Sequence, residues 1–86
     1  MEFNQLYYFL QVCKYGSFSK AARNINITQQ AISKSISKLE TEINLPLFNR
    51  SSTGVTLTQY GLFLQKRSEN IINELDYISL QLKQLS

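Results

Sequence analysis

The sequence contains no histidine and no tryptophan, and it has a single cysteine, Cys13. Without histidine, neither a Ser–His nor a Cys–His nucleophile pair exists, and the commonest zinc ligand is missing. One cysteine cannot close an internal disulfide, which excludes a disulfide-stapled secreted scaffold. Cys13 falls on an apolar helical stripe, so we expect a buried thiol rather than a reactive one. We therefore expect no metal site and no cofactor.

Glycines and paired carboxylates are equally scarce. The only glycines are Gly16, Gly54 and Gly61, too far apart to form a glycine-rich phosphate loop. Glu40 and Glu42 are two residues apart, so a helix places them on different faces, where they make no general acid/base pair. We therefore do not expect an enzyme.

Long apolar runs are also absent. No stretch reaches the ~18 residues that a membrane helix needs, and the start, MEFNQLYYF, has no basic region before an apolar core, so we expect no signal peptide. These features fit a cytoplasmic protein. A chain of 86 residues forms at most one domain with a projecting element. A domain of this size is marginally stable alone, so dimerisation would add stability.

Charge is unevenly distributed along the chain. The formal net charge is +3, but residues 14–67 hold eight basic and two acidic side chains, whereas residues 68–86 hold one basic and three acidic. A basic body with an acidic tail favours a polyanionic partner for the body alone. The alternative is a chance asymmetry of a solvated surface.

Helical spacing predicts three helices in the first half of the chain. The first runs from Phe3 to Tyr15, ends at Gly16, and is followed by a short helix from Phe18 to about Ile25 that Ser17 caps. The third runs from Gln29 to Ile43 behind the N-cap Thr28. The side chains expected to face the core are Phe3, Leu6, Phe9, Leu10, Val12, Cys13, Phe18, Ala22, Ile25, Ala31, Ile32, Ile36, Leu39 and Ile43. Two short helices joined by a tight turn predict a helix-turn-helix.

Polar side chains occupy the other face of the third helix. Thr28, Gln29, Gln30, Ser33 and Lys34 lie opposite Ile32, Ile36 and Leu39. Amides and hydroxyls are poor solubilisers, but they suit the donor and acceptor pattern of the DNA major groove, which admits one helix. The alternative is a solvent-facing surface that happens to be rich in serine and glutamine.

A hairpin is predicted after the third helix. Pro46 ends that helix, and Leu45, Leu47 and Phe48 are expected to close the base of the core. The stretch RSSTGVTLT then has the turn residues and the alternation of a hairpin, which makes a wing. Arg50 at its base suits a phosphate. The tip, formed by Ser52, Thr53 and Gly54, has no basic side chain, so a weak minor-groove contact or a plain structural hairpin is expected.

The last helix is predicted to run from Gln59 to about Leu85, or roughly 40 Å. Residues spaced by four and three form a heptad seam, which consists of Leu64, Ser68, Ile71, Leu75, Ile78, Leu82 and Leu85. Such a seam predicts a coiled-coil homodimer. Tyr60, Leu62 and Phe63 are expected to face the body instead. The alternatives are a single helix packed on the core and a module that pairs with a different partner helix.

Five segments together resemble the DNA-binding domain of bacterial LysR-type transcriptional regulators. They are LYYF, GSFSKAA, TQQAISKSISKLE, LPLFNR and LTQYG, and they cover nearly the whole chain. The resemblance implies a mainly α fold, in which a winged helix-turn-helix domain, residues 1–58, precedes a linker and dimerisation helix, residues 59–86. It implies antiparallel pairing of linker helices, a double-stranded DNA partner with an interrupted inverted repeat, and control of transcription.

The same resemblance implies roles for individual residues. Bases would be contacted by Gln29, Gln30, Ser33 and Lys34, and the DNA backbone by Ser17, Ser19, Thr28, Lys38 and Arg50. The chain departs from the family pattern at Gln30, where proline is usual, at Lys34, where arginine is usual, and at the wing tip. Family members continue into a domain that senses a small-molecule effector. The chain thus resembles an excised DNA-binding part, with an effector only for the full-length protein.

Overall fold

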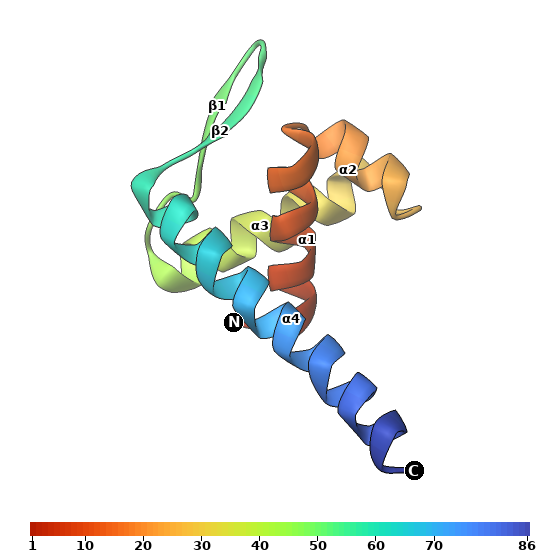
Figure 1. Ribbon diagram of the computed structural model, residues 1–86. Coiled ribbons are helices and arrows are strands. Elements are labelled where there is room, and N and C mark those ends of the chain that lie inside the picture. The colour runs from red at the N-terminus through yellow and green to blue at the C-terminus, as the bar shows by residue number, and fades with distance from the viewer.

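The computed structural model describes residues 1–86 as four helices and one two-stranded hairpin (Figure 1). The elements are α1 (Phe3–Tyr15), α2 (Phe18–Asn24), α3 (Gln29–Ile43), β1 (Phe48–Ser51), β2 (Gly54–Leu57) and α4 (Gln59–Leu85). The mainly helical fold with a wing-like hairpin is therefore confirmed. No helix combines the length and apolar character that crossing a membrane requires.

The helix ends follow the capping residues that the sequence predicts. Gly16 ends α1 in the left-handed conformation at φ 63°, and its N–H donates to the carbonyl oxygen of Val12. The side-chain oxygens of Ser17, Thr28 and Thr58 each accept a backbone N–H from the first turn of α2, α3 and α4. α2 ends at Asn24, one residue earlier than predicted, because the chain turns through Asn26 at φ 57°.

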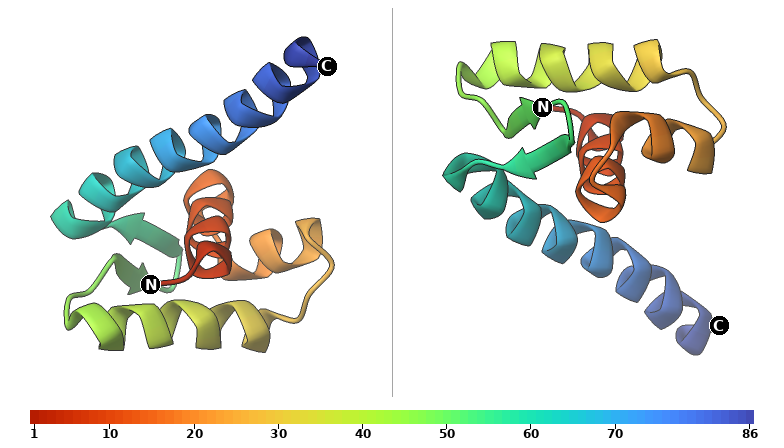
Figure 2. Two further views of the ribbon diagram at one scale, coloured as in Figure 1. Left: turned by 90° about the horizontal axis from the view of Figure 1, so that it is seen from below. Right: turned by 90° about the horizontal axis from the view of Figure 1, so that it is seen from above.

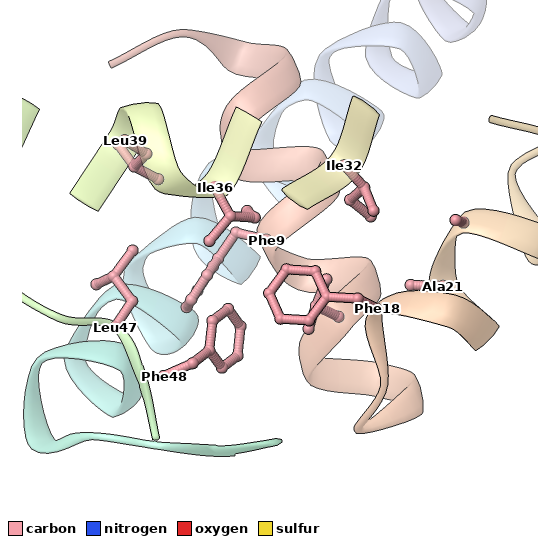
Figure 3. Packing of buried hydrophobic residues seen from close by; sticks show 10 residues of the cluster. Phe9, Phe18, Ala21, Ile32, Ile36, Leu39, Leu47 and Phe48 are labelled. Carbon is pink, nitrogen blue, oxygen red and sulfur yellow. The ribbon is translucent and has the colours of Figure 1, made fainter. Parts of the chain in front are cut away.

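The core lies between α1, α2, α3 and the start of β1 (Figure 3). Its ten buried residues are Phe9, Val12, Phe18, Ala21, Ala22, Ile32, Ile36, Leu39, Leu47 and Phe48. The Phe48 ring lies 5.2 Å from the Phe9 ring and 5.7 Å from the Phe18 ring, between centroids. Each large apolar side chain buried here stabilises the fold by about 1.5–3 kcal/mol.

The predicted core face of α1 is partly wrong. Phe3 is 49% exposed, and Leu10 and Cys13 are only half-buried, whereas Leu6, Phe9 and Val12 face the centre. Gln5, which lies about 200° round the helix from Phe3, is buried at this end of α1. Its amide oxygen accepts the N–H of Glu2, and its amide nitrogen donates to the carboxylate of Glu42. A polar side chain whose amide has partners at both ends can therefore be buried beside the core.

The thiol of Cys13 is free and half-buried. Burial raises the pKa of the thiol to about 12, and the negative charge of Glu69 adds to the shift. The thiol therefore stays protonated at neutral pH, as expected of a structural cysteine.

Two further predictions about the core are wrong. Ala31 is exposed, and Leu45 is 39% exposed while Leu47 and Phe48 are buried. Leu45 lies in the turn that follows α3, where its N–H bonds back to the carbonyl oxygen of Glu40. The turn places its side chain outside.

The start of α4 also differs from expectation. Tyr60, Leu62 and Phe63 are 40%, 57% and 64% exposed, because the helix meets the body through Gly61 and Leu64 instead. A Cβ atom at Gly61 would collide with the carbonyl oxygen of Leu47. Each residue turns ~100° around a helix, so the neighbours of Gly61 point away from the body.

Candidate nucleic-acid interface

The outward direction of α3 is fixed by three isoleucine and leucine side chains. Ile32, Ile36 and Leu39 are 0% exposed and point from α3 into the core (Figure 3). Because these three side chains hold one face inward, the opposite face with Gln30 and Lys34 lies in solvent. The predicted N-cap Thr28 fixes where the helix begins, since its Oγ1 accepts the N–H of Ala31 at 3.1 Å.

A groove of about 290 Å³ lies where α2, α3 and the hairpin meet. Its walls bring together seven of the predicted contact residues, which are Ser17, Ser19, Gln29, Ser33, Arg50, Ser52 and Gly54. Three segments distant in the sequence therefore present hydroxyl, amide and guanidinium groups to one space. Such groups bind phosphate oxygens and base edges.

The remaining predicted contact residues lie outside this groove. Gln30, Lys34 and Lys38 are exposed on α3, and Thr53 is exposed at the hairpin tip. Gln29 and Ser33, one turn apart, face the hairpin, whereas Gln30 and Lys34 follow each of them by one residue and lie further round the helix. α3 thus carries two neighbouring polar stripes.

Arg50 is the one cation in the groove wall. Its guanidinium carbon lies 4.4 Å from the centroid of the Phe18 ring, and its Nη2 lies 3.8 Å from Oε1 of Glu40. The side chain is still 46% exposed. A planar guanidinium stacked on an aromatic ring keeps N–H donors free at its edge. Arg50 is therefore oriented before any ligand arrives.

Glu40 holds the neighbouring loop in place, a role that the sequence pattern missed. Its Oε2 accepts the N–H of Leu47 at 2.7 Å and that of Phe48 at 3.4 Å, which ties α3 to the loop before β1. The sequence identified Glu40 only as an unlikely acid/base residue. Partners seven and eight residues away along an irregular loop leave no periodic signal.

The hairpin is attached to the body at both ends. At its base, Oγ1 of Thr58 donates to the carbonyl oxygen of Pro46 at 2.6 Å, and β1 pairs with β2 antiparallel from Phe48 opposite Leu57. Near its tip, the N–H of Val55 donates to the carbonyl oxygen of Gly16 at 3.4 Å. The wing therefore lies beside the turn that carries Ser17.

The charges around the groove are mainly positive. Lys20, Arg23, Lys34 and Lys38 are exposed on α2 and α3, and Arg50 lines the groove from the hairpin. No three histidine, cysteine, aspartate or glutamate side chains gather where they would hold a metal ion. This surface suits a polyanion.

A second surface runs along the outer part of α4. Its C-terminal turns stand clear of the body, and the molecule measures 50 × 26 × 20 Å (Figure 2). Five residues of the predicted seam are exposed, and they are Ile71, Leu75, Ile78, Leu82 and Leu85. The other two, Leu64 and Ser68, pack on the body of their own chain.

Exposed side chains continue this stripe toward the start of α4. Phe63 and Arg67 stack on one another, with the guanidinium carbon 5.1 Å from the ring centroid. On the helix they lie beside the line of Ile71 and Ile78. The exposed stripe of α4 thus includes Phe63 and Arg67 where the heptad pattern has Leu64 and Ser68.

Comparisons with known proteins agree with this geometry. Residues 3–62 match the family described as bacterial regulatory helix-turn-helix protein, lysR family. The transcriptional regulator SoxR of Arthrobacter sp. is 43% identical over 76 residues, which are 88% of this chain and 26% of SoxR. The uncharacterised regulator YybE of Bacillus subtilis is 38% identical over 74 residues, which are 86% of this chain and 25% of YybE.

A solved structure extends the agreement to the whole chain. The crystal structure of the BenM DNA-binding domain with benA site 1 DNA superposes with a TM-score of 0.94 and 31% identity, and covers 100% of both chains. The chain spans about a quarter of the length of the curated relatives it matches. By family match, relatives and fold, the chain belongs to the lysR family of bacterial helix-turn-helix regulators.

Proposed function

We propose that this chain is the sequence-specific DNA-binding part of a cytoplasmic transcriptional regulator, in which α3 enters the major groove of double-stranded DNA. The observation that carries the proposal is the groove at the meeting of α2, α3 and the hairpin, with Arg50 oriented in its wall. A related DNA-binding domain of the same fold was crystallised with DNA. The known chemistry of base edges and phosphates supports base contacts from the polar face of α3 and phosphate contacts from the residues around it.

Base contacts are assigned to the first turns of α3. An amide such as Gln29 or Gln30 bonds two atoms of adenine, and Lys34 bonds the O6 and N7 acceptors of guanine. Ser33 serves either a base or a phosphate. Because Gln30 and Lys34 are fully outward, they would contribute most to sequence preference.

Backbone contacts are assigned to residues that line the groove or lie outside it on α3 and the hairpin. They are Ser17, Ser19, Thr28, Lys38 and Arg50, with Ser52, Thr53 and Gly54 at the wing. These residues fix the position of α3 on the duplex and carry no sequence information themselves. Without a basic side chain, the wing tip would add little to affinity in the minor groove.

We further propose that α4 makes the dimer, so that residues 1–58 bind DNA and residues 59–86 join two copies. Five exposed apolar side chains in a stripe support this, since burying each of them stabilises a dimer by up to about 1.5–3 kcal/mol. Antiparallel pairing of the two helices is what the resemblance to the family implies. A two-fold dimer would bind an inverted repeat. A small-molecule effector would act only in a full-length protein.

A salt titration tests the DNA-binding proposal. Binding of the chain to duplexes selected by it from a random pool should weaken steeply as salt rises, with a slope of about −0.9 for each phosphate contacted. A flat response would contradict the proposal. Sedimentation tests the dimer separately: a monomer at micromolar concentration would favour a different partner helix for the α4 stripe.

A further inference from the structure

One carboxylate lies within the basic surface that is proposed to meet DNA. Glu40 holds the loop before β1 with one oxygen, and its other oxygen lies 3.8 Å from Nη2 of Arg50. The Glu40 side chain is only 20% exposed, whereas Arg50 is 46% exposed. A carboxylate at this point repels phosphate oxygens, so its place beside Arg50 lowers the attraction that the groove offers to any duplex.

Arg50 stands on a boundary between two hollows. On one side is the groove with Gln29 and Ser33, and on the other an open hollow of about 630 Å³ that Ser37 and Phe48 help to line. Arg50 thus borders open space on both sides. The guanidinium packs against the Phe18 ring. The only anion within ion-pair distance of the guanidinium is Glu40.

We propose that Glu40 is a positioning residue that raises the preference of this protein for its own DNA sequence over others. It restrains the position of the Arg50 guanidinium relative to α3. The distance between the phosphate that Arg50 binds and the bases that α3 contacts is therefore fixed. Glu40 also competes with phosphate for the N–H donors of Arg50. This competition weakens binding to duplexes in which α3 makes no base contacts. This inference rests on the proposed DNA-binding function.

The ion pair between Glu40 and Arg50 leaves N–H donors of Arg50 for a phosphate. At 3.8 Å and with a half-exposed partner it is weak, and the guanidinium has five N–H donors, enough to face a carboxylate and a phosphate together. Glu40 therefore restrains Arg50 without withdrawing it from DNA.

Glu40→Gln separates this role from the structural one. The amide oxygen of glutamine still accepts the N–H groups of Leu47 and Phe48, while the charge that faces Arg50 is removed. The matched control is Glu42→Gln, which removes an equal charge from the same helix. Glu42 pairs with the Met1 amine at 3.3 Å and with Gln5, and has no contact with Arg50.

The experiment measures the affinity of the 86-residue chain for two duplexes. One is selected by the wild-type chain from a random pool, and the other has the same composition in scrambled order. Glu40→Gln should lower the ratio of the two affinities about two- to five-fold, mainly by tightening binding to the scrambled duplex. Glu42→Gln should leave the ratio unchanged. On an Arg50→Ala background, Glu40→Gln should have no further effect on the ratio.

Two results would overturn the inference. If Glu40→Gln and Glu42→Gln change the affinity ratio equally, Glu40 contributes only its negative charge to the surface. If Glu40→Gln changes the ratio as much on the Arg50→Ala background as in the wild type, Glu40 acts through the loop before β1 and not through Arg50. Circular dichroism verifies that each variant is folded. If Glu40→Gln does not fold, Arg50→Lys decides: it keeps the charge but loses the guanidinium that Glu40 positions, so the ratio should fall at an unchanged salt slope, and an unchanged ratio would contradict the inference. A wild-type chain that binds neither duplex would refute the proposed function instead.

Discussion

Apolar residues spaced four and three apart occur both in the body and in the outer half of α4, but they are buried in the body and exposed in α4. In α3, Ile32, Ile36 and Leu39 are 0% exposed, whereas in α4 Ile71, Leu75 and Ile78 are 43–48% exposed. The first set meets α1 and β1 within one chain, and the second set extends past the body (Figure 1). Periodicity therefore identifies an apolar face but does not say whether the same chain or another copy covers it.

The largest test of this contrast compares one alanine substitution in each region. Ile36→Ala removes a fully buried side chain and should lower the free energy of unfolding by about 2–5 kcal/mol at any protein concentration. Ile78→Ala should leave the dilute monomer nearly as stable and weaken only self-association. Chemical denaturation at two protein concentrations, with sedimentation, measures both. Equal destabilisation of the dilute monomer by the two variants would contradict the contrast.

The boundary between the two regions is set by Gly61. A methyl group there would collide with the carbonyl oxygen of Leu47 and crowd the side chain of Leu57, so α4 must move. Gly61→Ala should therefore cost about 1–3 kcal/mol even though alanine favours helices. Gly61 is helical and has no positive φ, so a backbone explanation is excluded. Thermal unfolding measures the change, and a more stable variant would show that the contact is loose.

A smaller effect is expected at Ser68, where α4 still packs on the body. Its hydroxyl is fully buried and its Oγ has no hydrogen-bond partner. Removing an unpaired buried hydroxyl relieves its desolvation penalty, so Ser68→Ala should be neutral or stabilise the fold by up to about 1 kcal/mol. Differential scanning calorimetry checks this. A clear loss of stability would mean that the hydroxyl has a partner in solution.

The smallest expected effect lies at the rim of the body, at Glu42. Its pKa is lowered by the hydrogen bond from Gln5 and then by the N-terminal amine. A lowered folded-state pKa means stability that is present above 4.5, the ordinary value, and lost as pH falls through the lowered pKa. Denaturation between pH 6 and pH 3, roughly the span in which carboxylates titrate, should thus show a shallower acid loss for Glu42→Gln than for wild type. If the stability of Glu42→Gln and that of the wild type fall equally with pH, the contacts of Glu42 with Gln5 and the N-terminal amine do not stabilise the fold.

Much of the fold was predictable because its signals are local. Gly16, Ser17, Thr28 and Thr58 mark helix ends through bonds to residues three or four positions away, which a sequence displays directly. The helix-turn-helix and hairpin follow from these boundaries. The polar face of α3 was likewise visible from its spacing opposite Ile32.

Several of the parts that were wrong or overlooked depend on contacts between residues that are not neighbours in the helical pattern. Gln5 is buried because it meets Glu42, and the exposure of Phe63 follows from the fit of Gly61 against Leu47. Glu40 was overlooked because its partners sit in an irregular loop and on the hairpin. None of these pairings has a period, so only the assembled chain displays them.

The central claim is that the outward stripe of α3 selects the DNA sequence. Its most direct test is selection from a random duplex pool by the wild type, by Lys34→Ala and by Arg50→Ala. Lys34→Ala should lose preference at one base pair per half-site, at a cost of about 1–3 kcal/mol. Arg50→Ala should weaken binding to every duplex and reduce the salt slope by about one, while the preferred base at each position stays the same. Identical selected sequences for wild type and Lys34→Ala would contradict the claim.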